Sequence, residues 1–235
     1  QIPMDHGREV VLSLNRMTRI IDADPADNTI TVEAGAILKS VQDAADAMDR
    51  LFPLSLASEG SCRIGGNLAT NAGGLNVIAY GNTRDLCLGL EVVLADGRVW
   101  NGLRRLRKDN TGYDLRNMFI GSEGTLGVIT GAVMKLYPKP RSWETGFIAV
   151  PDPQAAVDLL SLTRDMSGNR AVAFELIADL ELQLAGRHTV PGQLGGGLVL
   201  HHPERHAEQC PTHRGALIGS RLLVPVIHGR CEVAA

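Results

Sequence analysis

The sequence predicts an α+β protein. Short β-branched runs separated by polar turns fill residues 9–34, and residues 36–48 carry apolar side chains at helical spacing. In addition, Asp96 and Gly97 form a strong hairpin signal between two apolar runs. Antiparallel strands packed with at least one amphipathic helix are therefore expected.

The first 140 residues account for most of these elements. Three strands are expected within residues 9–34, the first at residues 10–14, and the helix at 36–48 packs on them. The hairpin around Asp96 supplies two further strands. A last strand at residues 126–137 follows a glycine-marked turn and is closed by prolines.

The remaining chain indicates a second domain and an unassigned tail. A strand at residues 147–150, a helix at 153–165, a strand at 170–176 and then the start of another helix resemble the opening of another α/β domain. Residues after 185 lack Lys, Asp, Asn, Phe, Tyr, Trp and Met and hold six of the seven histidines. We therefore expect a first domain at 1–140, the start of a second at 141–184, and no assignable fold at 185–235.

Composition narrows the class of protein. With 235 residues, 44% hydrophobic content and a formal net charge of -3, the chain can bury a core and has no single-sign field that would attract nucleic acid or a membrane. No apolar run approaches the roughly 20 residues that a spanning helix needs. The four cysteines form no C-x-x-C pair and are expected to be free thiols. These features favour a cytoplasmic protein.

Glycines crowd residues 60–74 and carry the main chemical signal. Paired glycines followed by a short helix place backbone N–H groups and a helix dipole at one point, as a pyrophosphate requires. Asn67, Thr70 and Asn71 add neutral donors and acceptors suited to ribityl hydroxyls or a flavin edge. The alternative is a glycine-rich surface loop that only turns the chain.

Four motifs occur in order along the chain, at residues 61–74, 90–99, 108–115 and 121–130. With them, residues 1–184 resemble the vanillyl-alcohol-oxidase-type (PCMH-type) FAD-binding domain, and most of all its branch of D-2-hydroxyglutarate, D-lactate and glycolate dehydrogenases. The resemblance implies two α/β subdomains, the second with an antiparallel sheet, and FAD extended between them. It also implies that a substrate or cap domain follows.

The resemblance further implies which residues contact FAD. Those expected around the diphosphate, ribityl chain and ring, or as main-chain contacts of a later strand, are Pro53, Ser61, Cys62, Gly65, Gly66, Asn67, Thr70, Asn71, Gly73, Gly74, Gly127, Val128 and Ile129. Glu123 also adjoins the cofactor in the family. A carboxylate beside a turn is often a solvated cap, and both readings of Glu123 stay open.

Two parts of the family pattern are not found here. Members carry a glycine-rich phosphate loop before the position where this sequence begins, and Gly7 would be its trailing edge. Members also place substrate-binding Arg and Lys residues and a histidine-based metal site around a His-Gly-Asn stretch, which this sequence lacks. Prolines interrupt the histidine-rich tail, so no metal site is expected from this set: His201, His202, His206, Cys210 and His213. The sequence thus looks like an incomplete copy.

Two smaller features have structural readings. The basic residues Arg104, Arg105, Arg107 and Lys108 could guide an acidic substrate or an electron-accepting partner, but a solvated surface is the favoured interpretation. Asp114 is expected to cap a short helix.

The function expected is FAD-dependent dehydrogenation of a small D-2-hydroxy acid, of 2-hydroxyglutarate, lactate or glycolate type, to the 2-oxo acid. Electrons would pass to an acceptor such as a quinone, an electron-transfer protein or a dye, and no catalytic residue is assigned. The alternative is an inactive flavin-binding or interaction fragment. A nicotinamide-binding dehydrogenase is disfavoured, because the glycine cluster follows a loop and lacks G-x-G-x-x-G.

Overall fold

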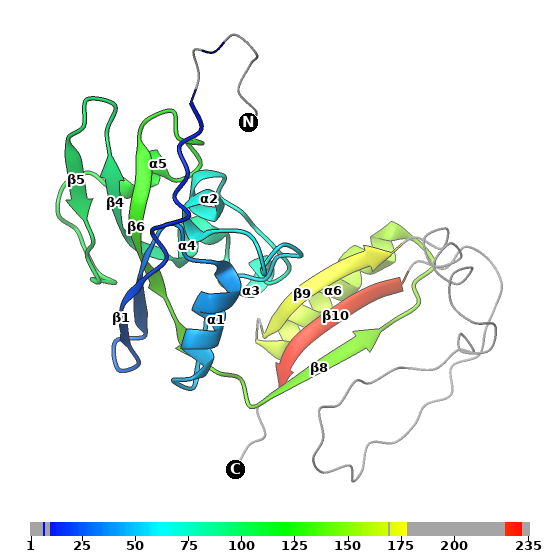
Figure 1. Cartoon of the computed structure of the whole chain (residues 1–235). Helices are drawn as coiled ribbons and strands as arrows, with labels where there is room; N and C mark the ends of the chain where they lie inside the picture. Colours follow the sequence, from blue (N-terminus) through cyan, green and yellow to red (C-terminus); the bar gives the residue numbers. More distant parts are fainter. Residues whose placement is uncertain (1–6, 8–9, 169, 178–223, 232–235) are drawn as a thin grey trace. The chain divides into compact units, whose positions relative to one another are not determined.

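The computed structural model describes residues 7, 10–168, 170–177 and 224–231, which fall into two compact units (Figure 1). The first comprises Gln1–Asn76 and Tyr80–Lys139, and the second comprises Val77–Ala79 and Pro140–Ala235. Helix α3 (Val77–Tyr80) is divided between the units, because Tyr80 belongs to the first and the three residues before it belong to the second. Helices and antiparallel strands are both present, so the predicted α+β class is confirmed.

The first unit is built on a five-stranded sheet in the order β1-β2-β6-β4-β5, with every pair antiparallel. Its strands are β1 (Ile20–Asp24), β2 (Thr29–Glu33), β4 (Cys87–Val93), β5 (Val99–Gly102) and β6 (Val128–Lys135). A separate two-stranded pair joins β3 (Arg50–Leu51) to β7 (Tyr137–Pro138). The Asp96 turn connects β4 to β5 as predicted, because its glycine takes the positive φ that the tight turn requires.

One face of the sheet is apolar. Ile30 pairs with Met134 and Val32 with Ala132, which is also opposite Leu90, and all five side chains are buried. Since residues opposite each other point to the same face, they form one continuous apolar surface. Helices α1 (Leu38–Asp46), α2 (Ile64–Ala69) and α4 (Thr83–Leu86) lie along one side of the sheet, and α2 contacts β6 (Figure 1).

The helix predicted at residues 36–48 is α1. Its buried residues Leu38, Val41 and Ala45 recur at the helical spacing, while Lys39 and Asp43 pair across one turn on the exposed side at 2.8 Å. The helix is therefore specified by its amphipathic pattern.

A basic loop covers the other face of the sheet. Residues 103–108 follow β5 at one edge, and Arg105 forms an ion pair with Asp22 of β1 at the opposite edge. Gly89 and Gly131 let the loop approach the sheet, because a Cβ at Gly89 would lie 2.5 Å from loop backbone and one at Gly131 would lie 3.6 Å from a leucine of the loop. The loop is therefore part of the folded unit.

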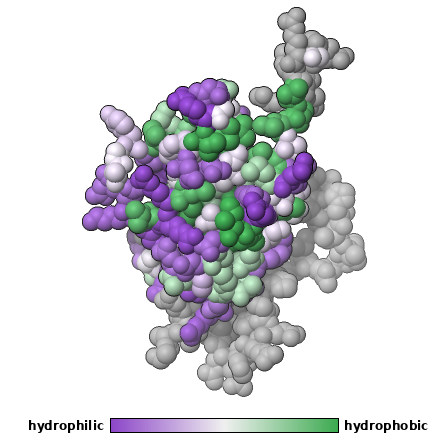
Figure 2. All heavy atoms as spheres, turned by 60° about the vertical axis from the view of Figure 1, so that its left-hand side comes forward, coloured by the Kyte–Doolittle hydropathy of each residue, from purple (hydrophilic) through white to green (hydrophobic). Residues whose placement is uncertain are grey.

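The strand predicted at residues 10–14 does not form. This segment is extended but belongs to no sheet, and Val10, Val11 and Leu12 are 91%, 72% and 69% exposed. Figure 2 shows hydrophobic spheres where the chain leaves the grey N-terminal residues. An apolar β-branched run becomes a strand only when another strand pairs with it, and none of the described strands does so.

The second unit contains a three-stranded antiparallel sheet in the order β8-β10-β9 with helix α6. Its elements are β8 (Ser142–Phe147), α6 (Pro153–Ser167), β9 (Ala171–Ile177) and β10 (Val224–Cys231). Helix α6 begins at an Asp152 cap, whose Oδ1 accepts the amide of Ala155 at 2.8 Å, and ends at Gly168 with φ 59°.

Two expectations for this unit need correction. The strand expected at residues 147–150 lies earlier, at Ser142–Phe147. The tail that sequence left unassigned contributes β10, which pairs with strands on both sides. Pro225 and Gly229 make β10 a poor strand by propensity, and pairing on both sides overrides that preference. The helix expected after residue 177 lies outside the described residues.

Candidate cofactor site

Helix α2 begins directly against the end of β2. The amide of Ile64 donates to the carbonyl of Ala36 at 3.0 Å, and the amide of Gly65 donates to that of Ala34 at 2.7 Å. A Cβ at Gly65 would lie 2.8 Å from the Cβ of Ala34, so glycine permits this approach. The expectation of bare amides is therefore wrong for these two, because carbonyls after β2 accept both.

Gly66 holds the third amide of the first turn. Its N–H has no hydrogen-bond partner within the described part of the chain, the residue is exposed, and an added Cβ would meet nothing within 4 Å. The free amides at a helix N-terminus attract negative charge. Gly66 is thus the amide of this turn that remains available to a phosphate oxygen.

The turn after α2 is held firmly by the segment that follows. The carbonyl of Ala72 accepts both the amide of Thr83 at 2.9 Å and its buried hydroxyl at 2.6 Å. Gly74 has φ 85°, and a Cβ there would lie 2.1 Å from the carbonyl oxygen of Ser55. The turn therefore has one conformation that only glycine fits at position 74.

The polar side chains predicted to face FAD already have partners inside the protein. Asn67 donates through Nδ2 to Cys62 Sγ at 3.5 Å, and Thr70 donates through Oγ1 to the carbonyl of Gly66 at 3.0 Å. Asn71 Oδ1 accepts a backbone amide of α4 at 3.0 Å. Asn71 Nδ2 has no partner among the residues that the structure describes, so it is a free donor at the turn.

A second turn packs against the carboxyl end of α2. The amides of Gly121 and Glu123 donate to the carbonyls of Leu68 and Ala69, each at 3.0 Å. Glu123 is exposed and has φ 52°, a left-handed conformation that is uncommon for glutamate. Two motifs that lie about fifty residues apart in the sequence are thus joined by direct hydrogen bonds.

The start of β6 lies beside these turns. A Cβ at Gly127 would lie 2.6 Å from a valine of β4, so the strand begins in close contact. Val128 and Ile129 pair with β4 and lie beyond Glu33 and Gly131, the last pair of β2 with β6. Their main chain therefore lies beyond the end of β2, on the part of β6 that follows the point where α2 packs against Ala34.

The fourteen predicted residues differ in exposure. Those that face solvent are Ser61, Gly66, Thr70, Gly74 and Glu123. Those that are buried or half-buried are Pro53, Cys62, Gly65, Asn67, Asn71, Gly73, Gly127, Val128 and Ile129. The carbonyl of Pro53 accepts a hydrogen bond from Asn76 Nδ2 at 2.8 Å. Five of the fourteen residues are thus accessible to a ligand from solvent, and the other nine lie wholly or partly beneath the surface.

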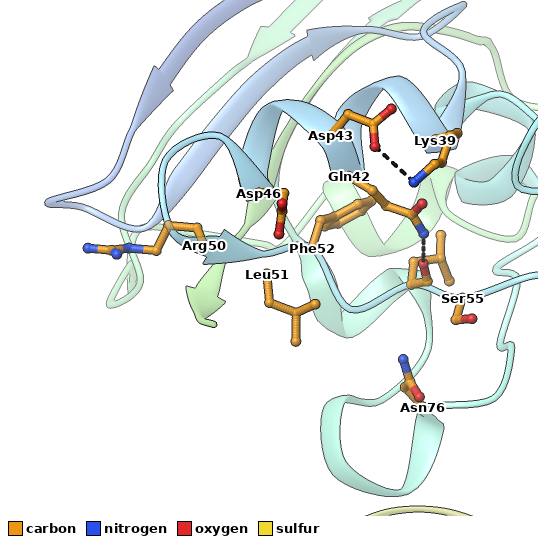
Figure 3. A pocket seen from close by; sticks show the side chains of 10 residues that line it. Lys39, Gln42, Asp43, Asp46, Arg50, Leu51, Phe52, Ser55 and Asn76 are labelled. Carbon is orange, nitrogen blue, oxygen red and sulfur yellow. Dashed lines mark hydrogen bonds and ion pairs between the residues drawn. The ribbon is translucent and has the colours of Figure 1, made fainter. Parts of the chain in front are cut away.

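Two clefts in the first unit lie elsewhere. One of about 400 Å³ is lined by residues of α1 and β3 together with Phe52, Leu54, Ser55 and Asn76. Two interactions join residues of its lining: Gln42 Nε2 donates to the carbonyl of Leu54 at 2.8 Å, and Lys39 pairs with Asp43 at 2.8 Å (Figure 3). The other, of about 380 Å³, lies between β5 and residues 104–116. Neither is lined by any of the fourteen residues.

The basic run contributes mainly to structure. Arg104 pairs with Asp109 at 3.1 Å, and Arg107 donates to the carbonyl of Asn28 at 3.3 Å. Residues 104–108 are exposed, as expected for a solvated surface, and these bonds show that the run also contributes to the fold.

Asp114 does not cap a helix with its side chain. Helix α5 (Arg116–Phe119) has no side-chain cap, and the Oδ2 of Asp114 accepts from Arg116 at 2.6 Å and from the side chain of Asn117 at 2.8 Å. Leu115 occupies the N-cap position, so Asp114 lies one residue too early to cap the helix.

Sequence reasoning missed Thr83 and Arg84. They follow the glycine motif by about ten residues and carry no glycine or phosphate signature, so their role in holding the turn appears only in the fold. The signal that sequence offered was the capping box formed by Asn82 and Asp85. Asp85 accepts the Asn82 amide at 2.9 Å, and this box marks the beginning of α4.

Other chemistry on the described residues is limited. Burial raises the pKa of the Cys87 thiol to about 12, and Cys62 is likewise a free thiol. No group of three His, Cys, Asp or Glu residues that could hold a metal occurs in the described ranges, and the histidines of the tail from His201 to His213 lie outside them. Within the same ranges, no helix has the length and apolar character for crossing a membrane.

Comparison with known proteins adds independent evidence. The D-2-hydroxyglutarate dehydrogenase of Rattus norvegicus is 43% identical over 180 residues, covering 77% of this chain and 34% of that protein. The D-2-hydroxyglutarate–pyruvate transhydrogenase of Saccharomyces cerevisiae is 38% identical over 169 residues, covering 72% and 34%. The chain spans about a third of the length of these relatives.

A solved structure of alkyldihydroxyacetonephosphate synthase has the same fold. It matches with a TM-score of 0.68 at 20% identity, covering 92% of this chain and 38% of the synthase. At this identity the likeness concerns the fold alone.

The expectation of a cytoplasmic protein is contradicted. The relatives from Rattus norvegicus, Danio rerio and Bos taurus are named mitochondrial. Net charge and the lack of a spanning segment are common to proteins of many compartments, so composition could not decide between them.

Residues 2–102 match the protein family that is described as FAD binding domain. This range includes the glycine motif, α2 and the turn that Thr83 and Arg84 hold. Residues 2–102 are therefore the part of this chain that is similar to known FAD-binding domains.

Proposed function

We propose that this chain supplies the FAD-binding part of an oxidoreductase that dehydrogenates a small D-2-hydroxy acid to the 2-oxo acid. The relatives named as D-2-hydroxyglutarate dehydrogenases support the reaction class, and the match of residues 2–102 supports the cofactor. Bound FAD would supply the two-electron acceptor, while the protein supplies binding and orientation.

The observation that carries the proposal is that three segments lie together at α2: the first turn of the helix, the turn after it that contains Asn71, and the second turn, which contains Glu123. The first turn of α2 leaves the Gly66 amide free, and hydrogen bonds from Gly121 and Glu123 fix the second turn to the other end of the helix. Glycine leaves open space at Gly66 and Gly124, where an added Cβ would meet nothing within 4 Å. A planar or phosphate-bearing group could therefore approach the backbone closely.

Each segment has a proposed role. The amide of Gly66 would bind a diphosphate oxygen, and Ser61, exposed on the loop before α2, would be a further contact. Asn71 Nδ2 and the acceptor lone pairs of Thr70 would bind ribityl hydroxyls or the ring edge. Glu123 and the main chain of Val128 and Ile129 would border the ring.

The hydroxy acid and the electron acceptor are assigned only by class. Relatives act on D-2-hydroxyglutarate by name, and 2-hydroxyglutarate is therefore the first substrate to test, followed by lactate and glycolate. The acceptor would be a quinone, an electron-transfer protein or, in the assay, a dye.

A second candidate is a flavin-binding protein without catalysis.

One titration and one assay separate these functions. FAD is added to the purified chain and binding is followed by quenching of flavin fluorescence, and D-2-hydroxyglutarate is then added with a dye under anaerobic conditions. Binding with dye reduction supports the dehydrogenase. Binding without reduction by any of the three acids supports the second candidate, and no binding at micromolar FAD contradicts both.

A further inference from the structure

Arg84 connects the two turns that flank α2. Its backbone amide donates to Asn71 Oδ1 at 3.0 Å, in the turn that follows the helix. Its side chain reaches the segment before the second turn: Nη1 donates to the carbonyl of Asn117 at 2.7 Å, and Nη2 donates to the carbonyl of Ile120 at 2.5 Å. One residue thus holds segments that are separated by about 45 positions in the sequence.

The packing around the guanidinium is close. A Cβ at Gly121 would lie 3.1 Å from Arg84 Nη2 and 3.6 Å from the Cβ of Asn71. Gly121 has φ 82° and Asn71 has φ 50°, so both turns adopt left-handed backbone at the point where Arg84 meets them. Loss of the side chain would release the segment from Asn117 to Ile120, whereas the bond from the backbone amide of residue 84 to Asn71 would remain.

We propose that Arg84 is a positioning residue for the cofactor, which sets the distance between the Asn71 turn and the Glu123 turn. The inference rests on the proposed function, because it assumes that FAD lies against both turns. The planar guanidinium can donate to two neighbouring carbonyls in a fixed geometry, whereas a lysine ammonium has one nitrogen. Arg84 itself does not contact the cofactor in this proposal.

A matched control is available in the same unit. Arg50 also donates three hydrogen bonds to backbone carbonyls, from Nε and Nη2 to Pro25 at 3.1 and 2.8 Å and from Nη1 to Asp49 at 2.8 Å. It ties β3 to the turn between β1 and β2 and touches neither flanking turn. Arg50→Met therefore removes a comparable structural arginine away from the proposed cofactor face.

The experiment measures FAD affinity and local protection in the full chain. We expect Arg84→Met to raise the dissociation constant for FAD about tenfold, the effect of losing well-formed charged hydrogen bonds. Arg84→Lys should recover part of this loss, and Arg50→Met should stay within about twofold of wild type. Hydrogen–deuterium exchange without FAD should rise in residues 117–124 for Arg84→Met. It should stay unchanged in residues 69–74, because the backbone amide of residue 84 still donates to Asn71, and Arg50→Met should change neither segment.

The outcomes distinguish this inference from the proposed function. Wild-type affinity in Arg84→Met, or an equal loss of affinity in Arg50→Met, overturns the positioning role. If the wild-type chain binds no FAD, the proposed function fails and the cofactor role of Arg84 fails with it. Exchange then tests the link alone, and unchanged exchange in residues 117–124 of Arg84→Met overturns that link too.

Discussion

The Gly65 amide and the Ala34 carbonyl oxygen lie 2.7 Å apart, and a Cβ on Gly65 would lie 2.8 Å from the Cβ of Ala34. Helix α2 therefore packs on the end of β2 at backbone distance. Its neighbour Gly66 is exposed, and an added Cβ there would meet nothing within 4 Å. The two adjacent glycines thus serve different purposes, and substitution separates them.

Gly66→Ala should make the protein more stable and bind FAD more weakly. Alanine lowers the entropy of the unfolded chain and favours the helix, so the free energy of unfolding should rise by about 0.5–1 kcal/mol. The new methyl group would stand where we place the diphosphate. Urea unfolding and FAD titration measure the two effects, and an unchanged FAD affinity would contradict a phosphate contact at Gly66.

Gly65→Ala serves as the control for that experiment. The methyl group must displace α2 from Ala34, and overpacking of this kind costs about 1–3 kcal/mol. Stability and FAD affinity should both fall. Opposite signs of the stability change at positions 65 and 66 would support the packing described here.

Gly74→Ala should destabilise the first unit. Position 74 has φ 85°, and the new Cβ would lie 2.1 Å from the carbonyl oxygen of Ser55, so the backbone itself must move. Left-handed strain and this clash together should cost about 2 kcal/mol or more. Thermal unfolding measures the loss, with Gly97→Ala as control because it has φ 84° but nothing within 4 Å of its Cβ. Equal losses in the two variants would refute the contact with Ser55.

Sequence predicted those elements whose signals are local. The Asp96 turn and the amphipathic α1 carry their pattern within a few residues, and both form. The run at residues 10–14 and strand β10 depend on partners elsewhere in the chain. The first was predicted to be a strand and is not one, whereas the second was left unassigned and is a strand. Arg84 was missed for the same reason, since all its side-chain acceptors lie more than thirty residues away.

The candidate site divides along the same line. The glycine motif could be found from sequence because close backbone approach requires glycine, whatever the fold. Sequence could not show which amides stay free. The amides of Gly65 and Ile64 donate to the carbonyls of Ala34 and Ala36, and these bonds depend on how α2 packs at the end of β2.

Glu123→Gly tests the two readings of that residue. Glutamate at φ 52° is strained, and glycine removes the strain, so the free energy of unfolding should rise by about 0.5–1 kcal/mol. If the side chain borders the flavin, FAD affinity falls, and if it is only solvated, affinity stays the same. Glu123→Gln is the matched control, because it removes the charge and keeps the backbone strain. Lower affinity in both variants would assign the effect to the carboxylate.

Cys87 should make the protein less stable at alkaline pH. Burial raises the pKa of its thiol to about 12, whereas the unfolded chain releases this proton near the ordinary value of 9.0. Between these values the folded state binds one more proton than the unfolded state, so stability is fully present below pH 9 and falls by about 1.4 kcal/mol per pH unit above it. Urea unfolding of wild type and Cys87→Ala at pH 8, 9 and 10 isolates this contribution, because other groups titrate alike in both. Curves that stay parallel above pH 9 would show that the thiol ionises with an ordinary pKa.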